Sequence, residues 1–129
     1  MKKLFEINEW KVIQRDFDNA QNEIAESVTS LGNGHMGFRG NFVEDFSGST
    51  LKGTYIAGIY YPDKTKVGWW KNGYPEYFAK ILNACDLISI SLRIDNETVD
   101  INKCDIKDFV RELNMKQGNL DQRGQVVFA

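Results

Sequence analysis

The sequence predicts a mainly β protein, an antiparallel β-sandwich with one short helix. Two observations lead to this expectation. Short segments rich in β-branched and aromatic residues are separated by turn residues at close spacing, and only one stretch has apolar residues at helical spacing. Because the 129 residues contain no internal repeat or linker, we expect residues 1–129 to form a single domain.

The first third of the chain is expected to supply a strand, the helix and a second strand. Residues Trp10–Phe17 place apolar side chains among charged ones, which is typical of a strand. In Asn19–Leu31 the apolar residues recur at helical spacing, and Asp18 or Asn19 is a suitable N-cap. Met36–Val43 alternates with period two and therefore predicts a strand.

The middle of the chain contains the strongest strand patterns. Thr54–Tyr61 is so rich in β-branched and aromatic residues that we expect a strand buried on both faces, ending at the proline that follows. Leu87–Ile94 alternates strictly, with isoleucine and leucine on one side and serine and arginine on the other. A turn at Asp95–Glu97 should then bring Val99 and Ile101 back as the second arm of a hairpin.

The last third predicts two further strands. Ile106–Met115 alternates imperfectly, Gln117–Asn119 is a turn sequence, and Val126–Phe128 begins a strand. Because the sequence stops at Ala129 within that strand, we expect the sandwich to be truncated at its C-terminal end and the chain to be a fragment of a longer enzyme.

Composition and charge exclude several classes of function. The net charge is −2 and the basic residues do not cluster, which argues against nucleic acid or an anionic membrane as a partner. No apolar run reaches the ~20 residues of a membrane-spanning helix, and the N-terminus lacks the apolar core of a signal peptide. We therefore expect a cytoplasmic protein in which Cys85 and Cys104 are free thiols.

A glycine-rich string is the most informative feature of the sequence. Gly32, Gly34 and Gly37 match the G-x-G-x-x-G pattern of dinucleotide sites, but such a site follows a strand and opens a helix. Here a helical segment precedes the string and a strand follows it, so we interpret it as a tight helix-to-strand turn. The residues assigned to this structural turn are Gly32, Asn33, Gly34, Gly37, Arg39 and Gly40. Arg39 is expected to pair there with a carboxylate or with backbone carbonyls.

The chain shows no complete catalytic or metal site. His35 is the only histidine, and it lies in the glycine-rich turn without a nucleophile motif nearby. One histidine and two distant cysteines do not form a metal-binding cluster. Carboxylate pairs such as Glu44 with Asp45 and Asp105 with Asp108 are interpreted as solvated turn residues. We therefore assign no catalytic residue, no metal and no cofactor to this chain.

An aromatic segment at residues 67–78 is the strongest candidate for binding. Its glycines, proline and charges favour a loop, and aromatic side chains on loops either stack on sugar rings or anchor interfaces. Three roles stay open: contact with a sugar or an active site, contact with another domain or subunit, and packing into the domain's own core. The candidate residues are Trp69, Trp70, Lys71, Tyr74 and Tyr77.

Several linked motifs carry a resemblance to a known family. The string from Leu31 to Gly40 after Glu26-Ser27-Val28, and Gly53–Tyr60 at the expected distance, resemble the N-terminal signature of glycoside hydrolase family 65. Trp69–Phe78 and Leu82–Ala84 look most like the branch that acts on maltose, and Arg111–Lys116 also fits. The resemblance covers about Trp10 to Leu120. Two departures are His35, where the family more often has tyrosine, and residues 121–126, which fit the family's next strand poorly.

The resemblance implies that this domain belongs to a larger disaccharide phosphorylase. Family members join an N-terminal β-sandwich, through a helical linker, to an (α/α)-barrel that carries the chemistry. The parent would phosphorolyse an α-glucoside such as maltose with inversion, giving β-glucose 1-phosphate and glucose without a cofactor. Trehalose and kojibiose phosphorylases are alternative parents. The implied partners are the catalytic barrel of the same chain, the disaccharide and a second copy in a homodimer.

Overall fold

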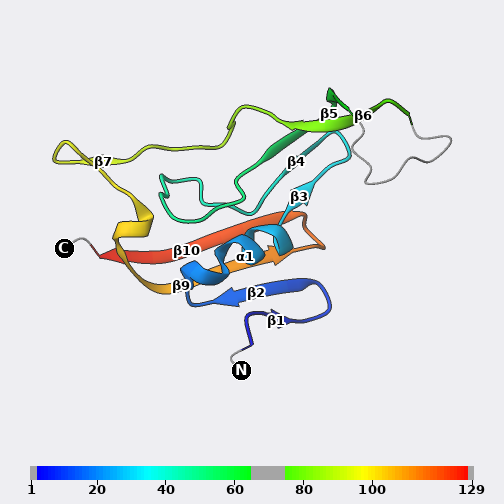
Figure 1. Ribbon diagram of the computed structural model, residues 1–129. Helices are drawn as coiled ribbons and strands as arrows, with labels where there is room; N and C mark the ends of the chain where they lie inside the picture. The colour runs from blue at the N-terminus through cyan, green and yellow to red at the C-terminus, as the bar shows by residue number, and fades with distance from the viewer. Residues whose placement is uncertain (1–2, 65–74, 128–129) are drawn as a thin grey trace.

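The computed structural model describes residues 3–64 and 75–127, which form two four-stranded antiparallel sheets, a two-stranded hairpin and one α-helix (Figure 1). This confirms the predicted mainly β fold with one short helix. The first sheet has the order β1-β2-β9-β10 and contains Glu6–Ile7, Lys11–Arg15, Asp105–Asn114 and Asn119–Val127. The second has the order β3-β4-β5-β6 and contains Leu31–Gly32, Met36–Phe38, Thr54–Lys64 and Tyr77–Asn83.

The helix α1 spans Asn22–Val28 and follows a 3₁₀ turn at Asn19–Gln21. Asp18 caps this turn, because its side chain accepts a hydrogen bond of 3.0 Å from the Ala20 backbone N–H. The predicted helix is therefore correct in place but shorter than expected, since Leu31 already begins β3.

The segment predicted as the clearest strand is not one. Of Leu87–Ile94, only β7 (Arg93–Ile94) lies in a named strand, and it pairs with β8 (Glu97–Thr98). Asp95 and Asn96 form the tight turn between them, with φ of 50° and 69°. Val99 does pair back, since its N–H donates to the Leu92 carbonyl oxygen at 2.8 Å. Ile101 does not, because its N–H donates to the Asp45 carbonyl oxygen at 2.9 Å and it begins a 3₁₀ turn. Both side chains are buried in the core.

Two other expectations about strands are wrong. Thr54–Tyr61 is not buried on both faces: β5 runs on to Lys64, and Tyr60 and Tyr61 are exposed. Pro62 is tolerated inside β5 because pairing with β4 ends at Ile56, which leaves a partner on one side only. The last strand begins at Asn119, so the residues that fit the family poorly form most of β10.

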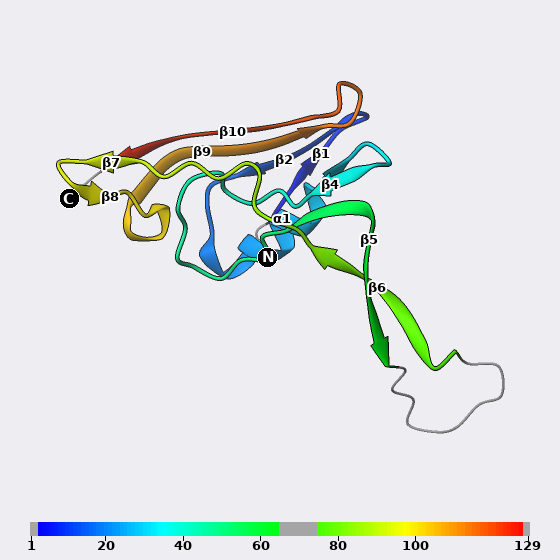
Figure 2. The same ribbon diagram turned by 90° about the horizontal axis from the view of Figure 1, so that it is seen from above.

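The main apolar core lies at one end of the first sheet. Phe42, Val99, Ile101 and Phe109 are buried together, and Phe17 packs its ring edge against Phe42 and Phe109 at 5.4 and 5.6 Å between centroids. The chain after β4 and the 3₁₀ turn at Ile101–Lys103 therefore cover this end of the sheet. Figure 2 shows the β5–β6 hairpin extending away from this body.

A polar row crosses the same face of the first sheet. The registers place Gln14 of β2 and Gln122 of β10 on either side of Arg111 of β9. Arg111 donates to Gln14 Oε1 and, across to α1, to Asn22 Oδ1, both at 3.2 Å. Its guanidinium also lies over the Phe42 ring, 5.2 Å from the centroid. Burial lowers the pKa of Arg111 to about 10, and the charge of Glu26 opposes that shift.

Glu26 of α1 connects this row to the segment that leads into β5. It is fully buried, and Oε1 accepts hydrogen bonds from Asn22 Nδ2 at 2.9 Å and Thr50 Oγ1 at 2.7 Å. Its Oε2 accepts from the backbone N–H of Leu51 at 2.6 Å. The helix therefore fixes the backbone only three residues before β5 begins at Thr54.

Candidate functional site

The glycine-rich string forms the tight connection between β3 and β4. Asn33 Oδ1 accepts from the backbone N–H groups of His35 at 3.0 Å and Met36 at 2.9 Å, which closes the turn. Gly34 has φ of 85°, a conformation that glycine adopts without steric cost. The predicted turn is therefore present, but it joins two short strands rather than a helix and a strand.

Gly40 is required for a close approach between the turn and α1. A Cβ at this position would lie 2.0 Å from Thr29 Oγ1 and 2.9 Å from the Thr29 carbonyl oxygen. The Gly40 N–H meanwhile donates to the Glu26 carbonyl oxygen at 2.9 Å. Arg39 does not take the expected carboxylate or carbonyl partner, since its Nη1 donates to Ser27 Oγ at 2.7 Å. These contacts give the string a structural role.

Four of the five predicted binding residues, Trp69, Trp70, Lys71 and Tyr74, lie outside the described residues. Tyr77 is described, and it is the first residue of β6, with about half of its surface exposed. The segment predicted as a loop therefore ends in a strand at Tyr77–Asn83. Sequence reasoning missed this strand, although its aromatic and branched residues Tyr77, Phe78 and Ile81 favour one.

The β5–β6 hairpin exposes apolar side chains on both faces. Its register pairs Tyr60 with Ile81 and Lys64 with Tyr77, which puts Tyr60, Ile81 and Tyr77 on one face. Alternation puts Tyr61 and Phe78 on the other face, where Lys80 and Asp63 form an ion pair. The exposed large apolar residues of the hairpin are Ile59, Tyr60, Tyr61, Tyr77, Phe78, Ile81 and Leu82, each 41% to 55% accessible. A two-sided apolar surface of this kind is typical of an element that contacts another polypeptide.

A shallow depression of about 240 Å³ lies where this hairpin meets the glycine-rich turn. His35 and Met36 line one side of it, and Tyr60 and Ile81 line the other. The Ala57 N–H donates to the His35 carbonyl oxygen at 2.7 Å, so the hairpin base and the turn are directly joined. The turn therefore supports the base of the exposed hairpin.

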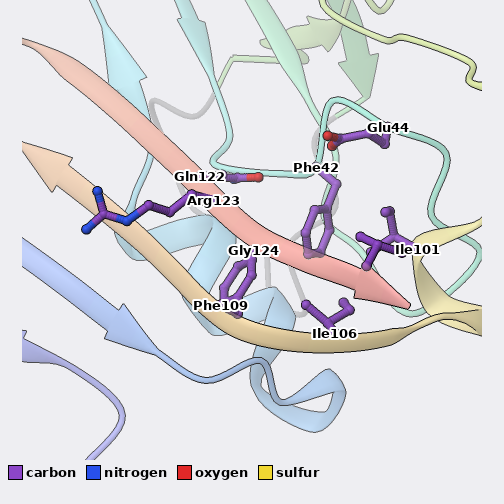
Figure 3. A pocket seen from close by; sticks show the side chains of 9 residues that line it. Phe42, Glu44, Ile101, Ile106, Phe109, Gln122, Arg123 and Gly124 are labelled. Carbon is purple, nitrogen blue, oxygen red and sulfur yellow. The ribbon is translucent and has the colours of Figure 1, made fainter. Parts of the chain in front are cut away.

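The pocket drawn in Figure 3 belongs to the apolar core. It measures about 70 Å³, and the side chains of Phe42, Phe109, Ile101 and Ile106 converge there beneath β10. Gly124 lies at the β-bulge of β10, where the register shifts between Arg123 and Gln125. Because its walls are the residues that hold the domain together, we do not consider this pocket a ligand site.

The described residues contain no group of three or more histidine, cysteine or acidic side chains that could hold a metal. Within the described residues, His35 forms hydrogen bonds through its backbone N–H and carbonyl oxygen, and Cys85 and Cys104 are free thiols, as expected. In the same part of the chain, no helix is long and apolar enough to span a membrane.

Sequence reasoning also missed the buried row around Arg111. The signal was present, because Phe109, Arg111 and Leu113 alternate and so must share the inner face of β9. Glu26 and Arg111 were read only as parts of family motifs, and their meeting across 85 positions of sequence is visible only in the fold.

Comparison with known proteins identifies a family and a solved structure with the same fold. The family model "Glycosyl hydrolase family 65, N-terminal domain" matches residues 12–127. A maltose phosphorylase from Bacillus subtilis is 52% identical over 98% of this chain, and an α,α-trehalose phosphorylase from Thermoanaerobacter brockii is 32% identical over 95%. A solved structure, described provisionally as a kojibiose phosphorylase from the human microbiome, aligns with a TM-score of 0.84 at 27% identity over 99% of this chain.

The fold and the comparisons together define the class of this domain: it is a mainly β domain of the kind found in disaccharide phosphorylases. The chain belongs to glycoside hydrolase family 65 and corresponds to its N-terminal domain. It spans only 16% of the length of the Bacillus subtilis relative and 17% of the solved chain. The match also includes residues 121–127, which looked atypical by sequence.

Proposed function

We propose that this chain is the non-catalytic N-terminal domain of an inverting α-glucoside phosphorylase that acts on maltose. Its role is to frame the active site or the dimer interface, and the β5–β6 hairpin is the element that makes the contact. The single observation that carries this proposal is the two-sided apolar surface of the hairpin, whose large apolar side chains are 41% to 55% exposed. The choice of maltose rests on the 52% identity to the Bacillus subtilis enzyme.

The chemistry of the parent explains why this domain needs no catalytic group. An inverting hydrolase uses a general base to activate water and a general acid to protonate the leaving group. Phosphate is already an anionic nucleophile, so a phosphorylase of this kind needs only the general acid. The acid, a glutamate in the family's barrel, would lie outside this chain, and inorganic phosphate is the co-substrate.

A carbohydrate-binding module is a second candidate. Exposed tyrosines at positions 60, 61 and 77 have the rigid, amphipathic rings that stack on sugars. Under this alternative, Trp69, Trp70, Lys71 and Tyr74 would extend the same platform. The hairpin would then bind maltose in the isolated domain as well as in the complete enzyme.

The two candidates are separated by Trp70→Ala in a full-length chimera, in which this chain replaces the matching 16% of the Bacillus subtilis maltose phosphorylase. We expect a changed oligomeric state or a lower kcat/KM if the segment frames an interface or active site. A saturable maltose response of the 129-residue chain, lost in Trp70→Ala, would instead establish a binding module. Tryptophan fluorescence and light scattering provide the readouts.

A further inference from the structure

The segment between β6 and β7 has the sequence of a strand but almost none of the pairing of one. Within it, Ile90 makes an isolated parallel bridge to Glu44, and its N–H donates to the Val43 carbonyl oxygen at 2.7 Å. Ile90 and Leu92 are nonetheless 59% and 47% exposed. Leu92 is also paired, because its carbonyl oxygen accepts a hydrogen bond from the Val99 N–H at 2.8 Å. A strictly alternating sequence that is paired at so few positions and exposes its apolar side chains is typical of a strand that lacks a neighbour along one edge.

The free edge of this segment is defined by its backbone. Successive residues of an extended chain direct their N–H and C=O groups to opposite edges. Because Ile90 directs its N–H toward Val43, the backbone N–H and C=O groups of Ser89 and Ser91 face the opposite edge of this segment. Within the described part of the chain, no backbone hydrogen bond joins these two serines to another segment.

We propose that this edge, residues 89–92, is a strand-addition site that is filled by a strand from the part of the full-length enzyme that follows the matched region. The inference rests on the proposed function, since it requires the longer polypeptide. The added strand would be hydrogen-bonded to Ser89 and Ser91. Its apolar side chains would lie on the same face as Ile90 and Leu92.

The position of β10 favours this occupant over a second copy of the chain. Val126, near the end of β10, packs against the cluster that contains Val99 and Ile101. It also lines the same pocket as Glu44, the residue that bridges to Ile90 (Figure 3). A polypeptide that continues from β10 therefore starts near Glu44, the residue that bridges to Ile90. At about 3.3–3.6 Å a residue, the connection would have to pass from the Glu44 side of this segment to its free edge.

Hydrogen exchange tests the proposal in the 129-residue chain and in the full-length chimera with the Bacillus subtilis enzyme. We expect the Ser89 and Ser91 amides to exchange at least ~100-fold more slowly in the chimera than in the chain alone. The Ile90 amide is an internal control, because its bond to Val43 is present in both proteins.

A matched pair of variants adds a second measurement. Ser91→Pro removes the N–H that the added strand would need, whereas Ser91→Ala keeps it, and both lose the 2.6 Å hydrogen bond from Ser91 Oγ to Asp45. We expect Ser91→Pro to lower the Tm of the chimera more than Ser91→Ala does, with no such difference in the short chain.

Three results would overturn the proposal. Fast exchange at both serines in the chimera would show that nothing covers the edge. Protection in the short chain that increases with protein concentration would identify a second copy as the occupant. Protection in the short chain at every concentration would place the partner within the 129 residues. Maltose phosphorolysis by the chimera is measured separately, so a failure of the proposed function is distinguishable from a failure of this inference.

Discussion

Two regions of this domain depart from the usual rule that polar side chains lie at the surface and apolar side chains lie in the core. Beneath α1, the polar side chains of Gln14, Asn22, Glu26 and Arg111 are fully buried. On the β5–β6 hairpin, large apolar side chains are about half exposed. Buried charges are rare unless paired, and apolar patches are rarely left in water. The buried network finds its partners inside the domain, whereas we propose that the hairpin contacts a partner outside it.

This contrast separates what stabilises the domain from what the domain does. The network ties α1 to the first sheet and holds the backbone just before β5 begins. Disrupting the network should therefore lower the stability of the isolated chain. The hairpin adds little to the stability of the chain, so its substitutions should be felt mainly in a complete enzyme.

The largest effect is expected for Arg111→Met. The substitution leaves Glu26 buried without its nearby cation and removes the hydrogen bonds to Gln14 and Asn22. We expect a loss of about 3–5 kcal/mol in the free energy of unfolding, measured by urea denaturation. Lys107→Met on the same strand is the matched control, because Lys107 is largely exposed and should cost less than about 0.5 kcal/mol. Equal effects of the two substitutions would contradict a stabilising network.

A smaller, pH-dependent effect is expected for Asp100→Ala. Burial alone would raise the pKa of Asp100, but hydrogen bonds from Ser47, Asn102 and Lys103 outweigh it and lower the pKa to about 2. Because the folded pKa lies below the usual value of 3.8, the stabilisation is present above pH 4 and lost as the pH falls toward 2.

Asp100 also caps the 3₁₀ turn at Ile101–Lys103, because its side chain accepts a hydrogen bond of 3.1 Å from the Asn102 N–H. Removing this cap should cost about 1 kcal/mol at pH 7. The unfolding free energy of the variant should then fall less steeply than that of the wild type between pH 4 and pH 2. Parallel pH profiles for the two proteins would show that the Asp100 carboxylate does not contribute in this way.

The sequence predicted the fold class and several elements because these depend on local patterns. The spacing of apolar residues located α1, and alternation located β2 and β9. Alternation alone failed for most of Leu87–Ile94, because a strand also needs a neighbour. Before β7 the described residues supply only the bridge at Glu44 and the hydrogen bond from Val99 to Leu92. Similarly, β-branched composition predicted burial for β5, but composition does not say on which faces another element packs.

The candidate site was only partly predictable. The aromatic segment at residues 67–78 includes Tyr77 and Phe78, which begin β6, although its glycines, proline and charges predicted a loop. The pairing of Tyr60 with Ile81 could not be read from the sequence, because the register shifts at an irregularity between Tyr55 and Tyr60, where Gly58 has φ of 87°. The buried contact of Arg111 with α1 is a long-range feature that local patterns do not encode.

The most direct test of the hairpin's role compares Ile81→Ser in two contexts. In the 129-residue chain, we expect a loss of no more than about 1 kcal/mol, since the side chain is 51% exposed. In the full-length chimera with the Bacillus subtilis enzyme, we expect about 2 kcal/mol or more, seen as a lower Tm or a dissociated dimer. Ile24→Ser, at a helix position that is 52% exposed, should have the same small effect in both. An equally small effect of Ile81→Ser in both contexts would contradict a contact made by this hairpin.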